Sequence, residues 1–398
     1  MPKETLKRAQ ELKDKIVRLR RVIHRHPELG FEEVNTAALV AQTLESLGIR
    51  VRTGVAKTGV VGYLGSEGPT VAIRADMDAL PIQELNEVPY RSQVLGVMHA
   101  CGHDAHVATA LGVAMLLADM KLPGQVRLLF QPSEEKQDEE GNTGAGLMVE
   151  EGAMEGVEAI IALHVDSETT DTGSIRISPG PMSAAVDDFK ATIRGESCHG
   201  ASPHLGRDPI FISAQVIGAV HGIVSRRIDP MKPAVISIGA IQGGTAANII
   251  PSEVRLEGTI RSLEEGIREE LHTELERALE VARALGGDYR LTIQRGEPVG
   301  VNDEGVSELI RQVAVDLLGA EHVLTIEPEM GGEDFAILAR EAPGAMFTLG
   351  TRKQGEIRLA HTPHFDIDEG ALPIGVALLA QCVLRYLTSA ASGPTSSL

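Results

Sequence analysis

The feature that most limits the possible folds of this chain is an ordered run of strands and helices between residues 184 and 295. Residue patterns there predict, in chain order, a strand (186–194), a helix (208–227), two strands (234–241 and 253–261), a helix (264–285) and a strand (288–295). The order β-α-β-β-α-β is typical of a ferredoxin-like fold, which builds a core of its own. We therefore expect residues 184–295 to form a separate α+β domain.

The segments on either side follow a different pattern. Strand-like runs alternate with helical ones at 59–64, 70–75, 104–120, 125–131 and 158–164, and a strand at 345–350 with further helices returns after residue 296. Such alternation is typical of a mostly parallel sheet. We predict an α/β fold in which residues 1–183 and 296–398 form one mostly parallel-sheet domain and 184–295 is inserted into it. Residues 4–25 are predicted to form one amphipathic helix that ends before Pro27.

Charge and cysteine content exclude several classes of partner. The formal net charge of −19 opposes binding to phosphate backbones and to anionic membrane surfaces. Three cysteines, at 101, 198 and 382, cannot all pair and favour a reducing compartment. The N-terminus lacks the apolar stretch of a signal peptide, and the longest apolar run, 370–380, is too short to span a bilayer. We expect a cytoplasmic protein that binds neither nucleic acid nor membranes.

Residues that can bind metal ions stand at the ends of predicted strands: Asp76 and Asp78, Glu134 and Glu135, and His164. In open α/β sheets the carboxyl ends of the strands form the ligand crevice, so these side chains are expected to converge. Of two adjacent carboxylates on a loop, one can bind a metal ion while the other takes a proton from water. The alternative for Glu134 and Glu135 is a solvated charge run.

The densest cluster of candidate ligands is HACGHDAH, residues 99–106. Thiolate and imidazole are good ligands for zinc, and Cys101 and His103 are close enough to share a site. The alternative is a buried cysteine beside histidines that cap a helix. His361, in LAHTPHF, is a further candidate that competes with His364.

The inserted segment carries polar candidates of its own. His199 follows Cys198 directly, so the two cannot easily face each other as base and nucleophile, which disfavours a Cys-His hydrolase there. The Asn248 amide and the Arg261 guanidinium could jointly hold a carboxylate. A turn-forming asparagine and an exposed arginine are the alternatives.

Ten motifs in order along the chain resemble the M20 metallopeptidase family, in particular its amidohydrolase branch of N-acyl-amino-acid, hippurate and auxin-conjugate hydrolases. They are RRVIHRHPELGFEE, RADMDALPI, MHACGHDAH, FQPSEE, LHV, CHGASPH, GGTAANIIP, EGTIRS, MGGEDF and HTPHFDIDEGALPIG. The resemblance implies a catalytic α/β domain that binds two divalent metal ions, and an inserted lid that also dimerises.

The resemblance also implies roles for single residues. The metal ligands would be Cys101, His103, Glu135, His164 and His361. Glu134 would be the general base, and Asp76 the acid that orients a ligand. His199 would polarise the scissile carbonyl, often from the partner subunit, and Asn248 with Arg261 would hold the substrate α-carboxylate, again partly across the dimer. Many M20 peptidases have an aspartate where this chain has Cys101, which is therefore the expected bridging ligand.

The expected activity is metal-dependent hydrolysis of N-acyl amino acids to a carboxylic acid and a free L-amino acid, with a dipeptidase, aminopeptidase or carboxypeptidase of the same family as the alternative. Zinc is the expected ion, and manganese, cobalt or nickel also suit these ligands. The partners are a small N-acyl amino acid or short peptide and a second copy of the chain, in a homodimer or a dimer of dimers. The competing classes are a metal-dependent binding protein and a thiol hydrolase that uses Cys101.

Overall fold

The computed structural model describes residues 2–65, 67–353 and 355–391, which divide into two compact units. The large unit contains the described residues up to Gly180, Val301–Glu327, and those from Ile337 onward. The small unit contains Pro181–Gly300 and Pro328–Ala336, and this second segment lies outside the predicted inserted range. Each unit has a hydrophobic core of its own.

The large unit is built on an eight-stranded sheet in the order β1-β2-β4-β3-β5-β16-β6-β15. The strands are β1 (Arg50–Val55), β2 (Gly59–Gly65), β3 (Thr70–Asp76), β4 (Gln125–Gln131), β5 (Ala159–Asp171), β6 (Ile175–Arg176), β15 (Val323–Leu324) and β16 (Gly344–Arg352). The central pairs β3–β4, β3–β5 and β5–β16 are parallel, whereas β1–β2 and β2–β4 are antiparallel. This mixed α/β architecture with a largely parallel centre confirms the predicted fold class.

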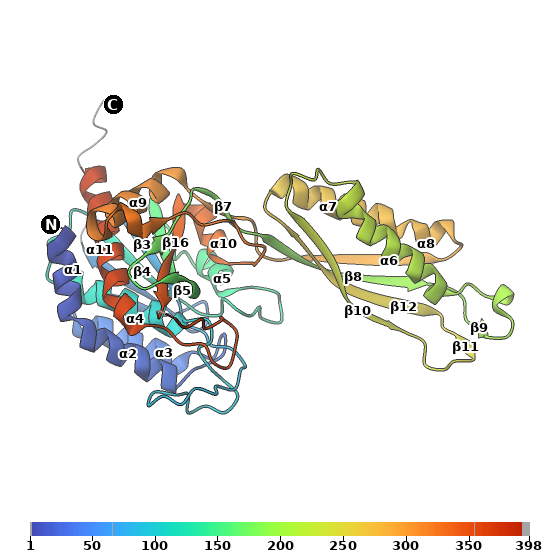
Figure 1. The fold of residues 1–398 in the computed structure, drawn as a ribbon, viewed down its shortest axis with the longest axis horizontal. Helices are drawn as coiled ribbons and strands as arrows, with labels where there is room; N and C mark the ends of the chain where they lie inside the picture. Colours follow the sequence, from blue (N-terminus) through green and yellow to red (C-terminus); the bar gives the residue numbers. More distant parts are fainter. Residues whose placement is uncertain (1, 66, 354, 392–398) are drawn as a thin grey trace, which may run out of the picture. The chain divides into compact units, whose positions relative to one another are not determined.

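Helices cover this sheet (Figure 1). They are α1 (Pro2–Glu11), α2 (Lys13–Arg25), α3 (Val34–Ser46), α4 (His103–Leu117), α5 (Gly144–Glu150), α9 (Glu304–Leu318), α10 (Phe335–Glu341) and α11 (Leu372–Ala391). The core joins alternate side chains of β3, such as Val71 and Ile73, to α4 and α11. Every residue of α4 except Met115 is buried, as expected of a helix that is apolar on all sides. The helix that begins at His103 is therefore held firmly within the core.

The small unit has a four-stranded antiparallel sheet in the order β10-β12-β8-β13. Its elements are β8 (Ala185–Arg194), β9 (Cys198–His199), α6 (Pro209–Arg226), β10 (Ala234–Gly243), β11 (Ile249–Ile250), β12 (Glu253–Ser262), α7 (Glu265–Leu279), α8 (Val281–Ala284) and β13 (Asp288–Arg295). Apolar side chains of α6 and α7 pack against the sheet to form the core. Two short strands, β7 (Gly180–Ser183) and β14 (Gly300–Asn302), pair with each other. The order of strands and helices is the predicted ferredoxin-like one.

Two predicted helices are each divided in the structure. Residues 4–25 form α1 and α2, which are separated at Leu12 by a tight turn in which the Leu12 N–H donates to Ala9 O at 3.1 Å. α1 packs mainly on α11 and α2 mainly on α4, so the change of direction at Leu12 lets each half follow its own main partner. The predicted helix 264–285 is similarly divided into α7 and α8 at Glu280.

Two of the described helices, α6 and α11, are long and apolar enough to cross a membrane by length and composition alone. Most of the apolar run 370–380 lies in α11, which extends beyond the run to Ala391. In the most apolar window of α11, 72% of the residues are buried inside the protein, against 33% in α6. The apolar side chains of α11 belong to the core of the large unit.

Candidate metal centre and active site

Parallel strand pairing brings the predicted acids and one histidine to the same edge of the large sheet. β3 pairs in parallel with β4, which places Asp76 opposite Gln131, and also with β5. The carboxyl ends of parallel strands meet at one edge of a sheet. Glu134 and Glu135 follow β4 after a short turn, and His164 lies within β5. These side chains are brought together as the sequence predicted.

Cys101 and His103 reach the same place from the start of α4. Gly102, which precedes α4, has φ +94°, and a Cβ atom there would lie 2.3 Å from Val165 Cγ2. Only glycine therefore allows this backbone to approach β5 so closely. Cys101 Sγ lies 3.4 Å from His164 Nε2, and the donor atoms of Cys101, His103 and His164 all lie within 4.8 Å of one another.

The imidazoles of this group are oriented by fixed acceptors. His103 Nδ1 lies 2.9 Å from Asp78 O and 3.1 Å from Asp78 Oδ1, and His164 Nδ1 lies 2.8 Å from Val165 O. We assign the Nδ1–H tautomer to both rings because only a donor can satisfy these acceptors. Burial lowers the pKa of His103, but the charges of Asp76 and Cys101 outweigh it and raise that pKa well above its ordinary value, so a metal ion bound at Nε2 would replace a proton.

A second group of donors joins the first through Cys101. Donor atoms of Cys101, Glu135 and His361 lie within 4.8 Å of one another, and His361 Nε2 lies 3.0 Å from Glu135 Oε1. The His361 N–H donates to Ala100 O at 2.8 Å, which fixes the loop of His361 beside Cys101. His361 has φ +58°, a left-handed conformation that is uncommon for a residue with a side chain.

Glu134 lies beside these ligands on a turn that other residues hold in place. It forms a third donor group with His103 and Glu135. Ser133, at φ +47°, donates its backbone N–H to Glu33 Oε1 at 2.8 Å. The Glu33 carboxylate, which was not among the predicted site residues, is fully buried under this turn.

Asp78, to which the resemblance gave no role, contacts two candidate ligands, and the orienting role of Asp76 stays a prediction. Asp78 contacts the His103 ring and also accepts the Glu135 N–H at 2.9 Å. Asp76 lies 2.6 Å from Arg74 Nη1, 2.5 Å from His106 Nδ1 and 3.6 Å from His103 Nε2. Asp76 ends β3 and Asp78 lies two residues later. The sequence alone could not tell which candidate ligands each of these two carboxylates contacts.

His106 is not available as a ligand although it belongs to the HACGHDAH segment. Its Nδ1 faces Asp76, and its Nε2 accepts the Val165 N–H at 3.0 Å. Burial lowers the pKa of His106 to about 4, so the ring is neutral. The ring therefore ties α4 to β5 and has no lone pair left for a metal ion.

The pKa shifts of Cys101 and His361 favour a thiolate and a protonated imidazole in this cluster. Burial alone would raise the pKa of the Cys101 thiol, but the imidazoles of His164 and His103 together outweigh this and lower it to about 6. Hydrogen bonds to Cys101 and Glu135 raise the pKa of His361 to about 10. A thiolate and a carboxylate beside a protonated imidazole form a site at which a divalent cation can replace the proton.

A buried nitrogen without a hydrogen-bond partner also supports a divalent ion at this cluster. Among the described residues, His103 Nε2 is buried without a hydrogen-bond partner, although its Nδ1 is fully engaged. Leaving a buried polar atom unpaired costs free energy unless another partner satisfies it. Soft sulfur, imidazole nitrogen and carboxylate oxygen together suit zinc and its neighbours in the first transition series.

In the small unit, His199 and Asn248 lie on adjacent segments. His199 on β9 pairs with Ile249 on β11, and the Gly200 N–H donates to Asn248 O at 2.8 Å. His199 is exposed, and its Nδ1 accepts the Ala201 N–H at 3.0 Å. Its Nε2 thus lies on the far side of the ring from this turn.

Arg261 is not brought to the same place. It lies near the carboxyl end of β12 and donates to Met330 O at 2.9 Å, whereas Asn248 precedes the first residue of that strand, Glu253. At ~3.3 Å per residue, the strand separates Arg261 from Glu253 by roughly 26 Å. Arg261 therefore lies far along β12 from the end of the strand that Asn248 precedes, and the joint role of the pair stays a prediction.

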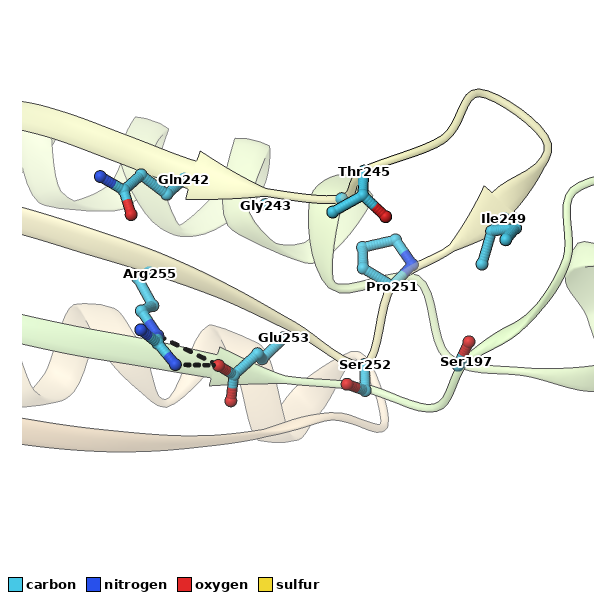
Figure 2. Close-up of a pocket in the computed structure, with 10 residues that line it drawn as sticks. Ser197, Gln242, Gly243, Thr245, Ile249, Pro251, Ser252, Glu253 and Arg255 are labelled. Carbon is cyan, nitrogen blue, oxygen red and sulfur yellow. Dashed lines mark hydrogen bonds and ion pairs between the residues drawn. The ribbon is translucent and has the colours of Figure 1, made fainter.

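A cavity of about 400 Å³ lies at the β9–β11 end of the small unit (Figure 2). Its walls include Gln242, Thr245 and Ile249, and Arg255 lies over Glu253 at 2.7 Å on one side. None of the predicted site residues is among the described residues that line it. We assign no role to this cavity.

Comparison with known proteins adds independent findings. The family model of peptidase family M20/M25/M40 matches residues 72–385. Thermostable carboxypeptidase 2 of Saccharolobus solfataricus is 41% identical over 389 residues, which are 95% of this chain and 96% of that protein. The N-acetyl-L-cysteine deacetylase of Bacillus subtilis is 37% identical over 383 residues, which are 95% of this chain and 89% of that protein.

A solved structure is also similar over nearly the whole chain. The YXEP protein of Bacillus subtilis, described as a dinuclear metal binding peptidase from the M20 family, superimposes with a TM-score of 0.82. It is 33% identical, and the match covers 95% of this chain and 99% of that one. The likeness therefore extends through both units.

Proposed function

The chain belongs to peptidase family M20, a family of dinuclear metal-binding hydrolases, and we propose that it hydrolyses the amide bond of N-acyl amino acids. The products are a carboxylic acid and a free L-amino acid. The likeness to an N-acetyl-L-cysteine deacetylase supports an acylated amino acid as the substrate.

The observation that carries this proposal is that two groups of donors share Cys101. One group adds His103 and His164, and the other adds Glu135 and His361. A shared thiolate between two sets of ligands is the arrangement that a pair of divalent ions needs. We propose zinc as the native ion, with manganese, cobalt or nickel as alternatives. When bound, such ions polarise the substrate carbonyl and lower the pKa of water.

Glu134 is proposed as the general base. Its carboxylate belongs to a group with His103 and Glu135, so it lies beside the ligands and can reach a water molecule held there. It would accept the proton of the attacking water and later deliver that proton to the nitrogen of the leaving amine. Asp78 keeps His103 and the backbone of Glu135 in place during both steps.

The small unit is proposed as a lid that also dimerises. His199 would stabilise the oxyanion, and Asn248 and Arg261 would hold the α-carboxylate of the substrate. Asn248 precedes β12 whereas Arg261 lies near the carboxyl end of that strand, which supports a joint role shared between two chains. We therefore propose that each active site takes Asn248 and His199 from the second copy in a homodimer or a dimer of dimers.

Subunit mixing tests this arrangement. Glu134→Gln and His199→Ala are each expected to be inactive alone. If His199 acts on the partner's site, refolding the two variants together gives mixed dimers with one intact site, and up to about a quarter of wild-type activity returns. If mixing restores nothing while size-exclusion chromatography shows mixed dimers, His199 acts within its own chain.

A second candidate activity is that of a carboxypeptidase. It is supported by the likeness to a thermostable carboxypeptidase over nearly the whole chain. Both reactions cleave an amide next to an α-carboxylate, so the same site could perform either one. For both, the proposed location is the cytoplasm and the partner is a small molecule.

A substrate panel tests the proposed function. Metal-stripped protein is given zinc, manganese or cobalt and assayed on N-acetyl, N-benzoyl and free dipeptide substrates, beside Glu134→Gln. We expect metal-dependent release of amino acid from acylated substrates and loss of this release in the variant. Cleavage of dipeptides or longer peptides alone would favour the peptidase candidate. Equal activity with and without metal would contradict both and favour a thiol hydrolase.

A further inference from the structure

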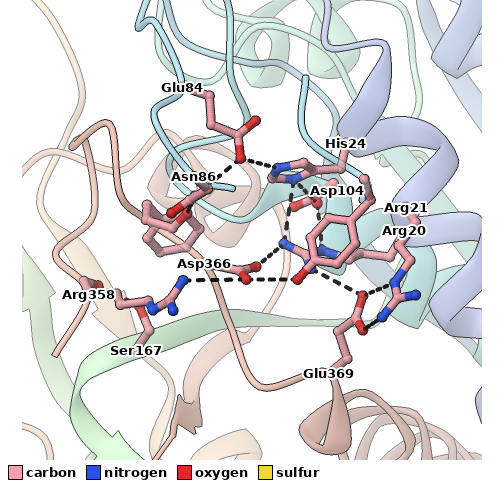
Figure 3. Close-up of polar contacts among 12 residues, drawn as sticks. Arg20, Arg21, His24, Glu84, Asn86, Asp104, Ser167, Arg358, Asp366 and Glu369 are labelled. Atoms are coloured by element: carbon pink, nitrogen blue, oxygen red, sulfur yellow. Dashed lines mark hydrogen bonds and ion pairs between the residues drawn. The ribbon is translucent and has the colours of Figure 1, made fainter. Parts of the chain in front are cut away.

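A buried guanidinium on α2 binds three carboxylates that come from two other parts of the large unit (Figure 3). Arg20 Nε lies 2.8 Å from Asp104 Oδ2, Nη2 lies 2.9 Å from Asp366 Oδ1, and Nη1 lies 3.2 Å from Glu369 Oε1. The Arg20 side chain is fully buried. The planar guanidinium therefore contacts three carboxylates at once through its three nitrogen atoms. A lysine ammonium has a single nitrogen and cannot reproduce these three directions.

These carboxylates stand next to proposed metal ligands. Asp104 follows His103 directly in the first turn of α4. Asp366 and Glu369 follow His361 on the loop that leads into α11. Arg20 thus connects the segment that carries Cys101 and His103 to the segment that carries His361, although it contacts none of the three.

Further hydrogen bonds hold the same two segments. His24 Nδ1 lies 2.8 Å from Asp104 Oδ2, and its Nε2 faces Glu84 Oε1 at 3.4 Å. Asn86 Nδ2 donates to Glu84 Oε1 at 3.1 Å and to Phe365 O at 2.8 Å. A chain of polar contacts therefore runs from α4 through α2 and back to the loop after His361.

The loop of His361 depends on such support. Between β16 and Glu369 the described residues form neither helix nor strand, and His361 has a left-handed backbone. A conformation of this kind persists only when surrounding contacts determine it. A buried cluster of charges is also costly to desolvate and adds little stability over apolar packing, so its position is better explained by a role in geometry.

We propose that Arg20 is a positioning residue that sets the distance between His361 and the Cys101–His103 segment, and so sets the affinity for the metal pair. It acts through Asp104 on one side and through Asp366 and Glu369 on the other. This inference rests on the proposed function, because it takes these residues as metal ligands. It assigns a role to the first motif of the sequence, whose residues do not reach the metal centre themselves.

The test compares Arg20→Lys with a matched control, Arg268→Lys. Arg268 also lies in a buried ion pair, with Asp187 in the small unit, so it controls for the loss of one buried guanidinium. Circular dichroism and thermal unfolding establish that both variants are folded, and calorimetric titration of metal-free protein with Zn²⁺ measures binding. We expect Arg20→Lys to bind at least one ion about 10-fold more weakly, and Arg268→Lys to bind as the wild type does.

Equal Zn²⁺ affinity in folded Arg20→Lys and wild type would overturn the inference. If wild-type protein itself takes up no Zn²⁺, the proposed function fails instead, so the two failures are distinguishable. Should Arg20→Lys not fold, Asp366→Asn removes only the charge on the His361 side and is measured in the same way. The same weakening is expected there, and unchanged affinity in that folded variant would equally contradict the role of Arg20.

Discussion

The Asp78 carboxylate lies 3.1 Å from His103 Nδ1, and its other oxygen accepts the Glu135 N–H at 2.9 Å. A single buried acid therefore orients two of the five proposed ligands. It fixes the tautomer of one and the backbone of the other. Residues in this position tune the metal affinity of a site without touching the metal.

Replacement of Asp78 by alanine should weaken metal binding by about 10- to 100-fold and leave the fold intact. His103 loses its orienting acceptor in this variant, and the Glu135 N–H loses its partner. Competition with a fluorescent zinc chelator measures the affinity. Asp171→Ala, which removes an exposed carboxylate paired with Arg352, is the control. An Asp78→Ala variant with wild-type affinity would show that Asp78 is not part of the site.

Glu134 and Glu135 should respond differently to the same change. Glu134→Gln is expected to lower kcat about 10²- to 10⁴-fold with metal content unchanged, because it removes a base but no ligand. Glu135→Gln is expected to lose metal, because an amide is a poor substitute for a ligating carboxylate. Steady-state kinetics beside elemental analysis of the purified variants separates the roles. Metal loss in Glu134→Gln with full occupancy in Glu135→Gln would reverse the assignment.

Cys101→Ser should lose metal, because a serine hydroxyl stays protonated at pH values where the thiol of Cys101, with its pKa lowered to about 6, is a thiolate. Elemental analysis of Cys101→Ser is compared with Cys198→Ser, which changes a cysteine of the small unit. The control is expected to keep its metal and its activity. If Cys101→Ser stays fully loaded yet inactive, the cysteine acts as a nucleophile and the thiol hydrolase is the better account.

Glu33 predicts a pH dependence of stability. Burial raises the pKa of Glu33 from 4.5 to about 7. Between pH 4.5 and about pH 7, Glu33 keeps its proton in the folded protein but has lost it in the unfolded chain. The contribution of Glu33 to the free energy of unfolding therefore falls as the pH rises through this range. The loss is roughly 3 kcal/mol and is complete above pH 7.

Glu33→Gln should remove this loss, since the amide does not ionise and its oxygen can still accept the Ser133 N–H. Urea unfolding of both proteins at pH 5 and pH 8 measures the effect as a difference, in which the pH dependence of metal binding largely cancels. Relative to wild type, the variant should gain stability on going from pH 5 to pH 8. Parallel pH profiles would mean that Glu33 ionises at its ordinary pKa in the folded protein.

Much of the fold could be predicted because most of its strands and helices have distinct periodicities of apolar and polar residues. β3 and β4 are almost wholly buried and contain runs of apolar residues, and the strands and helices of the small unit follow clear alternation and helical periodicity. β1 was missed because its residues are mostly exposed and polar, as at the edge of a sheet. The break at Leu12 was missed because tertiary packing on two helices decides it.

The convergence of Cys101, His103 and His164 could be predicted because strand ends and one motif carry them. The roles of Asp78, Glu33 and Arg20 could not, because they depend on contacts between segments far apart in the chain. Arg20 and Asp366 are separated by 346 residues, and no local pattern connects them. Asp76 and Asp78 are chemically identical in the sequence, and only the direction of each side chain separates them.

The most direct test of the central claim is a crystal structure of the metal-loaded enzyme, with diffraction data collected at the absorption edge of the metal. We expect two anomalous peaks, both within bonding distance of Cys101 Sγ, one beside His103 and His164 and the other beside Glu135 and His361. A single peak, or two peaks of which neither contacts Cys101, would contradict a metal pair that shares this thiolate.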